Sequence, residues 1–259
     1  MTTYTYRDIK NNYLQKKDWE KQFPVSYYLF RPLSFPISYV VLRFTTSPSR
    51  VAWVGFSLGL AGCVAFLCLK EVSIWPGAVL LLLCALSDAV DGNVARTTHS
   101  VTYYGKLLDG LLGAAVEGSY GFFLGLGFYR AGEAFPFIEA VVPGTNIQPL
   151  FIIIGAIFTI GWFFSNLIAE SYEKVLSIKE MGQTRESLTN QIQSSRFRNH
   201  IWYRLFINLH AVNLQLLILV LMAAIGRAPL FLLIWAIYYV VRVAVHFTFY
   251  LHRAGEVLS

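Results

Sequence analysis

Charged residues are scarce in this chain: Lys, Arg, Asp and Glu together make up 14% of its 259 residues. Soluble domains carry about 25% charged residues. Here 56% of the residues are hydrophobic and 16% are aromatic. The shortage of charge excludes an ordinary soluble domain, and it predicts that much of the protein surface faces lipid.

Cysteine is also scarce, and its placement excludes two kinds of site. Cys63, Cys68 and Cys84 all lie in apolar runs, with a spacing that fits neither a zinc site nor a disulfide framework. We expect all three to be small buried hydrophobic residues. The first 23 residues contain no apolar stretch of the kind found in secretory signals, so we expect no cleavable signal peptide.

Long apolar runs, in contrast, are abundant. A helix needs roughly 20 apolar residues to cross a bilayer. Six runs approach or exceed this length, at about residues 51–69, 75–95, 104–129, 148–170, 202–225 and 228–251. We therefore predict an all-α polytopic membrane protein whose six transmembrane helices form one domain over residues 51–259.

Two other segments complete the predicted organisation. Residues 1–50 form a basic N-terminal segment, in which the apolar stretch 24–47 is interrupted by Pro32 and Pro36. Two prolines this close argue against a span and favour a short amphipathic helix in the membrane interface. Residues 171–200 are polar, and we expect a cytoplasmic helical hairpin or loop there, with a plain linker as the alternative.

Basic residues are distributed unevenly between the two sides of the predicted bundle. Fifteen Lys and Arg residues lie in the N-terminal segment, the tail and the connections on the same side, whereas the alternate connections hold only Lys70, Arg130 and Arg227. The positive-inside rule then places both termini in the cytoplasm. The net charge of +6 indicates contact with anionic lipid, and we expect no nucleic-acid partner.

Three carboxylates interrupt the apolar pattern at the second and third spans. Residues 88–96 read D-A-V-D-G-N-V-A-R, and residues 105–109 read G-K-L-L-D. Asp88 and Asp91 share one helix face, and a short connection brings Asp109 beside them at the cytoplasmic end. A carboxylate near hydrocarbon costs about 2.5–3.5 kcal/mol, so three together need a compensating divalent cation. The alternative, ordinary charges at helix ends, does not account for three carboxylates at this spacing.

Neighbouring residues of the same stretch suit a phosphate-bearing ligand. Gly92 removes a side chain beside Asp91, which allows a phosphate or ribose to approach the backbone. Arg96 offers a planar fork that holds phosphate oxygens bidentately. Gly105 permits close contact either between the two spans or with a nucleotide. Further along the third span, a stripe of small residues predicts tight packing on another helix: Gly110, Ala114 and Gly118.

These stretches resemble the signature of the CDP-alcohol phosphotransferase family, also called CDP-alcohol phosphatidyltransferases: D-x2-D-G-x2-A-R-x8-G-x3-D-x3-D. Residues 31–50, RPLSFPISYVVLRFTTSPSR, are similar to the family's stretch before its first span. The resemblance implies a six-span membrane enzyme that transfers a phosphoalkyl group from a CDP-alcohol to an acceptor and releases CMP. It further implies phospholipid or related phosphodiester synthesis, and a homodimer in the lipid bilayer.

The resemblance also assigns roles to individual residues. It implies Mg²⁺ or Mn²⁺ as cofactor, with Asp88, Asp91 and Asp109 as its ligands. It implies a CDP pocket shaped by Gly92, Ala95, Arg96 and Gly105. The motif specifies the CDP group, and it leaves open the donor alcohol, the acceptor and the number of metal ions.

The chain departs from the signature at its last position, where Gly113 replaces an aspartate. In the family this aspartate is a metal contact and the expected base for the acceptor hydroxyl. In a first interpretation, Glu117, one turn further along, substitutes as the base and acts beside Asp109. Glu117 has an alternative role as a buried acid that packs against a basic partner, for which the candidates are Arg204, His210 and Arg242.

Two other interpretations of Gly113 remain. The acceptor needs no strong base if its attacking oxygen is already ionised, as in a phosphate-bearing acceptor, or if a metal ion lowers the pKa of its hydroxyl. Alternatively, the chain is catalytically impaired and binds a CDP-lipid without converting it. A transporter is a further alternative, although carriers bind near the bilayer midplane and these acids lie at the cytoplasmic end. We favour an active enzyme because the nucleotide half of the motif is complete.

Overall fold

The computed structural model describes residues 4–70, 73–133, 148–181 and 208–258, and every regular element in these ranges is a helix. Five helices are long and apolar enough to cross a membrane. They are α3 (Pro48–Phe66), α4 (Trp75–Thr97), α5 (Tyr103–Ala131), α7 (Pro149–Met181) and α11 (Ala228–Leu258). The prediction of an all-α polytopic membrane protein is confirmed.

The predicted fifth span and the predicted cytoplasmic segment are described only in part. Helix α10 (Val212–Ala224) covers the second half of the fifth span, and residues 201–207 lie outside the described ranges. Helix α7 continues without a break to Met181, so residues 171–181 extend the fourth span's helix. The remaining residues predicted as a hairpin, loop or linker lie outside the described part of the chain.

The N-terminal segment contains α1 (Tyr6–Glu20), the short π-helix η1 (Ser26–Phe30) and α2 (Arg31–Val41). Helix α1 begins with a capping box, in which Asp8 N donates to Thr5 Oγ1 at 3.2 Å and Thr5 N donates to Asp8 Oδ2 at 2.8 Å. This capping box satisfies N–H groups that have no partner within the helix.

Helix α2 forms despite its two prolines and is amphipathic, as predicted. Pro32 lies in the first turn, where its missing N–H has no intrahelical partner to lose, while Pro36 is accommodated inside the helix. One face is buried and includes Ser34 and Ser38. The opposite face exposes large apolar side chains, as expected of a helix that lies against lipid: Leu33, Ile37 and Val40.

Proline and glycine mark the ends of the longer helices. Pro48 and Pro76 lie in the first turns of α3 and α4. Helix α5 begins with the side chain of Thr102, which accepts a hydrogen bond from Gly105 N at 3.0 Å. It ends at Gly132, whose φ of 71° is the left-handed conformation that favours glycine.

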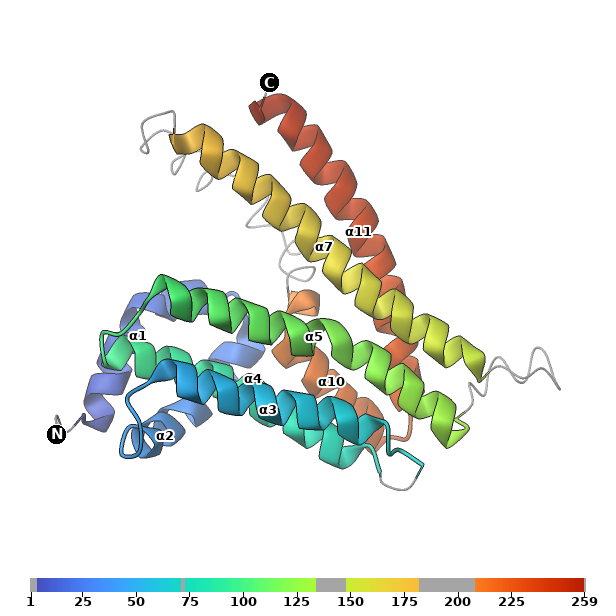
Figure 1. Cartoon of the computed structure of the whole chain (residues 1–259), viewed down its shortest axis with the longest axis horizontal. Helices are drawn as coiled ribbons and strands as arrows, with labels where there is room; N and C mark the ends of the chain where they lie inside the picture. Colours follow the sequence, from blue (N-terminus) through green and yellow to red (C-terminus); the bar gives the residue numbers. More distant parts are fainter. Residues whose placement is uncertain (1–3, 71–72, 134–147, 182–207, 259) are drawn as a thin grey trace.

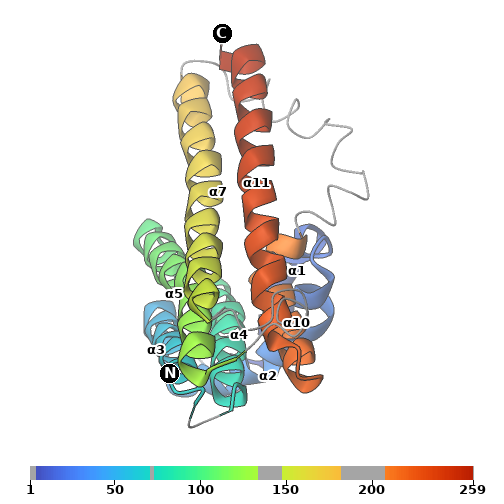
Figure 2. The ribbon, with the colours of Figure 1, turned by 90° about the vertical axis from the view of Figure 1, so that its right-hand side faces the viewer.

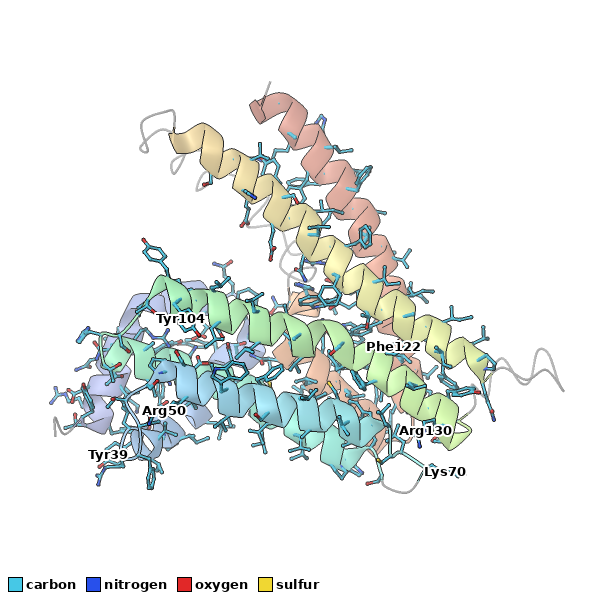
Figure 3. The ribbon with its side chains drawn as sticks, in the orientation of Figure 1. Tyr39, Arg50, Lys70, Tyr104, Phe122 and Arg130 are labelled. Carbon is cyan, nitrogen blue, oxygen red and sulfur yellow. The ribbon has the colours of Figure 1, made fainter. Side chains whose placement is uncertain are left out.

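Helices α3, α4 and α5 lie side by side, whereas α7 crosses α5 and runs beside α11 (Figure 1). Seen from the side, α7 and α11 extend together beyond the other helices (Figure 2). Side chains of the N-terminal segment, such as Tyr39 and Arg50, lie at one end of the α3–α5 group (Figure 3). Lys70 and Arg130, from alternate connections, lie together at the other end, which agrees with the predicted up-and-down path of the chain.

Glycine allows α5 and α7 to approach at their crossing. A Cβ atom built at Gly125 would lie 2.4 Å from the carbonyl oxygen of Phe151, and one at Gly155 would lie 2.9 Å from the carbonyl oxygen of Gly121. Backbone this close leaves no room for any side chain. The predicted small-residue packing of the third span therefore holds for Gly118, which contacts α7, and for the glycines that follow it.

The same packing prediction holds for Ala114, which packs against the buried core, but it is wrong for Gly110. A Cβ atom at Gly110 or at Gly113 would meet no heavy atom within 4 Å. The reason is geometric: α7 crosses α5 at an angle and diverges from it towards the α5 N-terminus (Figure 1). A stripe of small residues identifies a face of a helix, but a crossing neighbour covers only part of that face.

Buried hydrogen bonds connect the helices at the centre of the bundle. Gln215 of α10 is fully buried, its Oε1 accepts from the Tyr120 hydroxyl at 2.6 Å, and its Nε2 donates to the Tyr239 hydroxyl at 2.8 Å. The rings of both tyrosines pack edge-on against Phe158 of α7. Helices α5, α7, α10 and α11 thus meet at one point.

The expectation for the cysteines holds in part. Cys63 is buried and Cys84 is half-buried, but Cys68 is exposed. Helix α3 ends at Phe66, so Cys68 lies in the turn that follows it rather than in the packed span. All three thiols are free, as the spacing predicted.

Candidate functional site

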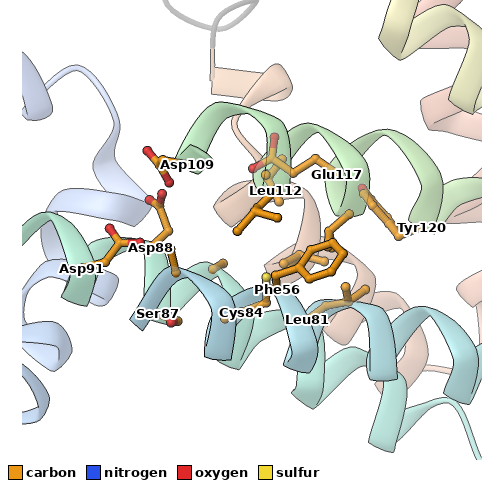
Figure 4. Close-up of a pocket in the computed structure, with 17 residues that line it drawn as sticks. Phe56, Leu81, Cys84, Ser87, Asp88, Asp91, Asp109, Leu112, Glu117 and Tyr120 are labelled. Atoms are coloured by element: carbon orange, nitrogen blue, oxygen red, sulfur yellow. The ribbon is translucent and has the colours of Figure 1, made fainter. Parts of the chain in front are cut away.

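The three aspartates of the motif converge. Asp88 and Asp91 lie in the last turns of α4, and Asp109 lies in the second turn of α5. One carboxylate oxygen from each lies within 4.8 Å of the other two (Figure 4). Asp91 is buried, whereas Asp88 and Asp109 are exposed. The predicted convergence of the two helix ends is therefore found in the structure.

This donor set fits a hard divalent cation. Oxygen ligands from carboxylates are those that Mg²⁺ and Mn²⁺ prefer, and such a site usually keeps positions for water and for substrate phosphate. Three carboxylates this close repel one another, and a bound cation converts the repulsion into coordination. Arg96, on the same helix, interacts electrostatically with Asp88 and Asp91 and offsets part of their charge.

Arg96 and Gly92 fit together on α4. A Cβ atom at Gly92 would lie 3.2 Å from Nη2 and 3.3 Å from Nη1 of Arg96. The guanidinium thus occupies the space that the glycine leaves. Nη2 of Arg96 donates to Oδ1 of Asn93 at 3.0 Å, and its buried Nε has no hydrogen-bond partner among the described residues.

The other two residues of the expected CDP pocket make few contacts. Ala95 is half-buried on α4, one residue before Arg96. A Cβ atom at Gly105 would meet only Thr102 Oγ1 within 4 Å, so Gly105 is not a point of close contact between the two spans. Of the two roles expected for Gly105, contact with a nucleotide remains the prediction.

A narrow cavity of about 60 Å³ runs from the aspartates along α5. Its lining includes Gly113, whose open side faces it, and further along the helix Glu117 and Tyr120 (Figure 4). A Cβ atom at position 113 would meet no heavy atom within 4 Å. Glu117 is therefore a carboxylate that shares one cavity with the aspartate cluster.

A second and larger cavity, of about 320 Å³, adjoins the first. It lies between the N-terminal segment, α4, α5 and the start of α10. Both cavities are lined by Asp88 and by Glu117, so these two acids lie where the cavities meet. Polar groups from separate elements line the larger one, among them Ser26, whose hydroxyl accepts from Asn213 Nδ2 at 2.7 Å.

Two of the partners expected for a purely packing role of Glu117 have other polar contacts, although one of them, His210, lines the larger cavity together with Glu117. His210 Nε2 is 3.2 Å from Asn166 Oδ1, and Arg242 Nη1 donates to the Tyr238 hydroxyl at 3.0 Å. Neither forms an ion pair with Glu117 within the described ranges. Arg204, the third candidate, lies outside them.

Two further residues, Asn93 and Arg31, contribute to the site although the sequence pattern did not indicate them. Asn93 is buried directly behind Arg96, and Arg31 reaches it from α2 with a hydrogen bond of 2.8 Å. The available signals were an arginine in an otherwise apolar stretch and an asparagine inside the motif. Neither signal identifies its partner, because the two residues are far apart in the chain.

Comparisons with known proteins show the family of the chain. The sequence model of the CDP-alcohol phosphatidyltransferase family matches residues 46–257. The phosphatidylinositol phosphate synthase of Cutibacterium acnes is 34% identical over 97 residues, which cover 38% of this chain and 45% of that protein. The matched part thus spans about half the length of this relative. Because the family match extends from just before α3 to the end of α11 and includes the aspartate cluster, this chain belongs to the CDP-alcohol phosphatidyltransferase family.

Proposed function

We propose that this protein is a membrane transferase that moves a phospho-alcohol group from a CDP-alcohol to an acceptor in phospholipid or related phosphodiester synthesis. An acceptor oxygen forms a bond to the phosphorus that carries the alcohol. The bond from that phosphorus to the oxygen of CMP breaks, and CMP leaves. A hydroxyl acceptor also loses a proton, whereas an ionised phosphate acceptor has none to lose.

The observation that carries this proposal is the convergence of Asp88, Asp91 and Asp109, with oxygens within 4.8 Å, beside an arginine. We infer that the three carboxylates hold Mg²⁺ or Mn²⁺. The cation supplies charge neutralisation at the diphosphate and stabilises the leaving CMP. Nη1 of Arg96 makes no hydrogen bond to the described residues and can bind phosphate oxygens. Gly92 makes room for the guanidinium, and Ala95 and Gly105 provide low walls beside it.

Glu117 is the group best placed to take the acceptor's proton. It lines both the aspartate cavity and the larger cavity, so an acceptor that enters through the larger one reaches Glu117 and Asp88 together. A carboxylate at that point acts as a general base for a hydroxyl, either directly or through one water molecule. Asp109, which lies beside Asp88 and lines the same cavity as Glu117, helps to position the attacking oxygen.

The test is release of CMP by the purified protein in nanodiscs. Donors are CDP-diacylglycerol, CDP-choline, CDP-ethanolamine and CDP-inositol, each offered with a panel of hydroxyl-bearing and phosphate-bearing acceptors. We expect one pair to give CMP release that EDTA abolishes and that Mg²⁺ or Mn²⁺ restores. Release that persists in EDTA contradicts the metal site, and no release from any pair contradicts the transferase activity.

The second candidate function is a CDP-lipid-binding protein without catalysis, and Gly113 is the observation that favours it. In this case the protein binds CMP or a CDP-alcohol in the presence of Mg²⁺ but releases no CMP with any acceptor. The same nanodisc preparation distinguishes the two functions, because binding is measured by calorimetry and turnover by the CMP that appears.

We further infer a cytoplasmic active site and a homodimer. The distribution of Lys and Arg supports cytoplasmic placement of both termini and of the aspartate cluster. Labelling of single cysteines introduced at Thr98 and at Lys70, in a variant whose three native cysteines are replaced, tests it, because a membrane-impermeant reagent added to intact cells should reach only position 70. Mass measurement of the protein in nanodiscs tests the dimer.

A further inference from the structure

Asn93 is a buried amide between the proposed nucleotide site and the N-terminal helices. It follows Gly92 on α4 and is 1% exposed. Its Oδ1 accepts hydrogen bonds from two guanidinium groups, from Arg31 Nη1 at 2.8 Å and from Arg96 Nη2 at 3.0 Å. One carbonyl oxygen therefore connects an arginine of α2 to the arginine of the motif.

The amide nitrogen of Asn93 is engaged as well. Nδ2 donates to the hydroxyl oxygens of Ser34 at 2.9 Å and Ser38 at 3.1 Å, both on α2. A flipped amide would present its two N–H groups to two guanidinium groups, which have no acceptor to offer. Helix α2 therefore fixes the direction of the oxygen that Arg96 meets.

Arg31 is itself held from several directions. It forms a buried ion pair with Glu20 of α1, with its Nε 2.8 Å from Glu20 Oε2. Its Nη1 also donates to the carbonyl oxygen of Ala89 at 3.2 Å, and its guanidinium lies 4.8 Å from the centre of the Tyr13 ring. Glu20 is 4% and Arg31 is 5% exposed, so the support behind Asn93 is buried and its charges are paired.

Arg96 meets this support from the side of the aspartates. Its guanidinium rests against Gly92, as the short distances to a Cβ at that position show. Nη2 is used by Asn93, and the buried Nε has no hydrogen-bond partner among the described residues. Nη1 makes no hydrogen bond to the described residues, so Asn93 orients a guanidinium that keeps its Nη1 donor for another ligand.

We propose that Asn93 is a positioning residue for nucleotide binding: it holds Arg96 in the orientation that meets the phosphate groups, and it links that orientation to the N-terminal helices. This inference rests on the proposed function, because it takes the ligand of Arg96 to be a cytidine nucleotide. Asn93→Ala leaves Arg96 without this restraint, so affinity for CMP falls about tenfold, as expected when one hydrogen bond to a charged group is lost.

A double-mutant cycle tests the link. The dissociation constant for CMP with MgCl₂ is measured by calorimetry in nanodiscs for wild type, Asn93→Ala, Arg96→Ala and the double variant. If Asn93 acts through Arg96, the double variant binds CMP within about twofold of Arg96→Ala alone, because the second change has nothing left to disturb. If the two losses multiply, Asn93 acts independently of Arg96 and the proposal is overturned.

Two further variants separate positioning from folding. Ser38→Ala removes one bond to Nδ2 but leaves the bond between Oδ1 and Arg96, so it lowers the unfolding temperature without changing CMP affinity. Asn93→Asp keeps an acceptor oxygen for both arginines while losing the amide donors, and it keeps affinity closer to wild type than to Arg96→Ala. An Asn93→Asp protein that binds CMP as weakly as Arg96→Ala contradicts the proposal, even if Asn93→Ala does not fold.

The same preparations distinguish this inference from the proposed function. If the four proteins of the cycle show the expected coupling in CMP binding but the wild type releases no CMP from any CDP-alcohol, the transferase activity is contradicted and the positioning role is supported. Normal CMP release together with unchanged affinity in Asn93→Ala contradicts the positioning role and supports the transferase activity.

Discussion

Asp109 and Gly113 lie one helical turn apart on α5, both line the cavity that contains the aspartate cluster, and a Cβ atom at Gly113 would have no heavy atom within 4 Å. Gly113→Asp therefore places a fourth carboxylate beside the other three without a steric clash. We expect this variant to bind Mg²⁺ about tenfold more tightly, because a further charged oxygen ligand joins the site. Calorimetry with MgCl₂ measures the change.

Gly113→Asn is the matched control for this variant, since it adds the same volume without the charge. In the absence of metal, Gly113→Asp should unfold at a lower temperature than Gly113→Asn, because four carboxylates repel one another more strongly than three. With saturating Mg²⁺ the order should reverse. Equal Mg²⁺ affinity in the two variants is the outcome that speaks against a metal site at this position.

Asp91→Asn should have opposite effects on the metal-free and metal-bound protein. Asp91 is the buried member of the cluster, and without metal its charge is repelled by Asp88 and Asp109. Its neutralisation should raise the unfolding temperature of EDTA-treated protein by about 2–4 °C. The same change removes a ligand, so the rise in unfolding temperature on addition of MgCl₂ should shrink or disappear.

Glu133→Gln is a suitable control for the Asp91 experiment. Glu133 is an exposed carboxylate just beyond the far end of α5, away from the cluster. Its neutralisation should leave the response to MgCl₂ as in wild type. If Asp91→Asn lowers the metal-free unfolding temperature, or if it responds to MgCl₂ as wild type does, the carboxylates do not act as one metal site.

The cluster was predictable because its geometry is local. Asp88 and Asp91 share a helix face through their spacing, and the short connection to α5 leaves Asp109 few places other than beside them. The helix ends at Pro48 and Gly132 also have local causes, since proline fixes its own φ in the first turn and glycine adopts the left-handed φ that ends a helix. The sequence predicts a structural feature when the residues that determine it lie within a few positions of one another.

The support behind Arg96 was not predictable, because it depends on how two distant helices pack. Asn93 pairs with Arg31, Ser34 and Ser38, about 60 residues earlier in the chain. No pattern in either segment specifies that α2 lies against this face of α4. The contact between Gly92 and Arg96 was not predictable either, because only the structure shows that the Arg96 side chain fills the space beside the glycine.

Glu117→Gln tests the substitute base. The change preserves shape and hydrogen-bonding capacity but removes the ability to accept a proton, so kcat for CMP release should fall about 100-fold or more with a hydroxyl acceptor. The KM for the CDP-alcohol and the Mg²⁺ affinity should stay unchanged. With an ionised phosphate acceptor, kcat should fall much less. This difference separates the interpretation in which Glu117 replaces the base from the one in which the acceptor needs no base.

Tyr120→Phe is the control for Glu117→Gln, because Tyr120 lines the same cavity one turn further from the aspartates. It removes the hydroxyl that donates to Gln215, so it should lower stability while leaving kcat near that of wild type. If Asp91→Asn abolishes CMP release and Glu117→Gln does not alter it with a hydroxyl acceptor, Glu117 is not the base.

Gly125→Ala tests whether the crossing of α5 and α7 holds the site in place. The added Cβ would lie 2.4 Å from the Phe151 carbonyl oxygen and 3.1 Å from Gly155 Cα, both backbone atoms, so α7 must shift as a unit. We expect a loss of about 1–3 kcal/mol in the free energy of unfolding. Gly110→Ala, on the same helix, meets nothing within 4 Å and should be neutral or stabilising by about 0.5–1 kcal/mol.

Reversible unfolding in mixed micelles gives the free energy of unfolding of both variants. Because α5 carries Asp109 and Glu117, a shift at the crossing should also lower CMP release in Gly125→Ala but not in Gly110→Ala. The reverse order of stability would mean that the two helices do not meet as the structure shows.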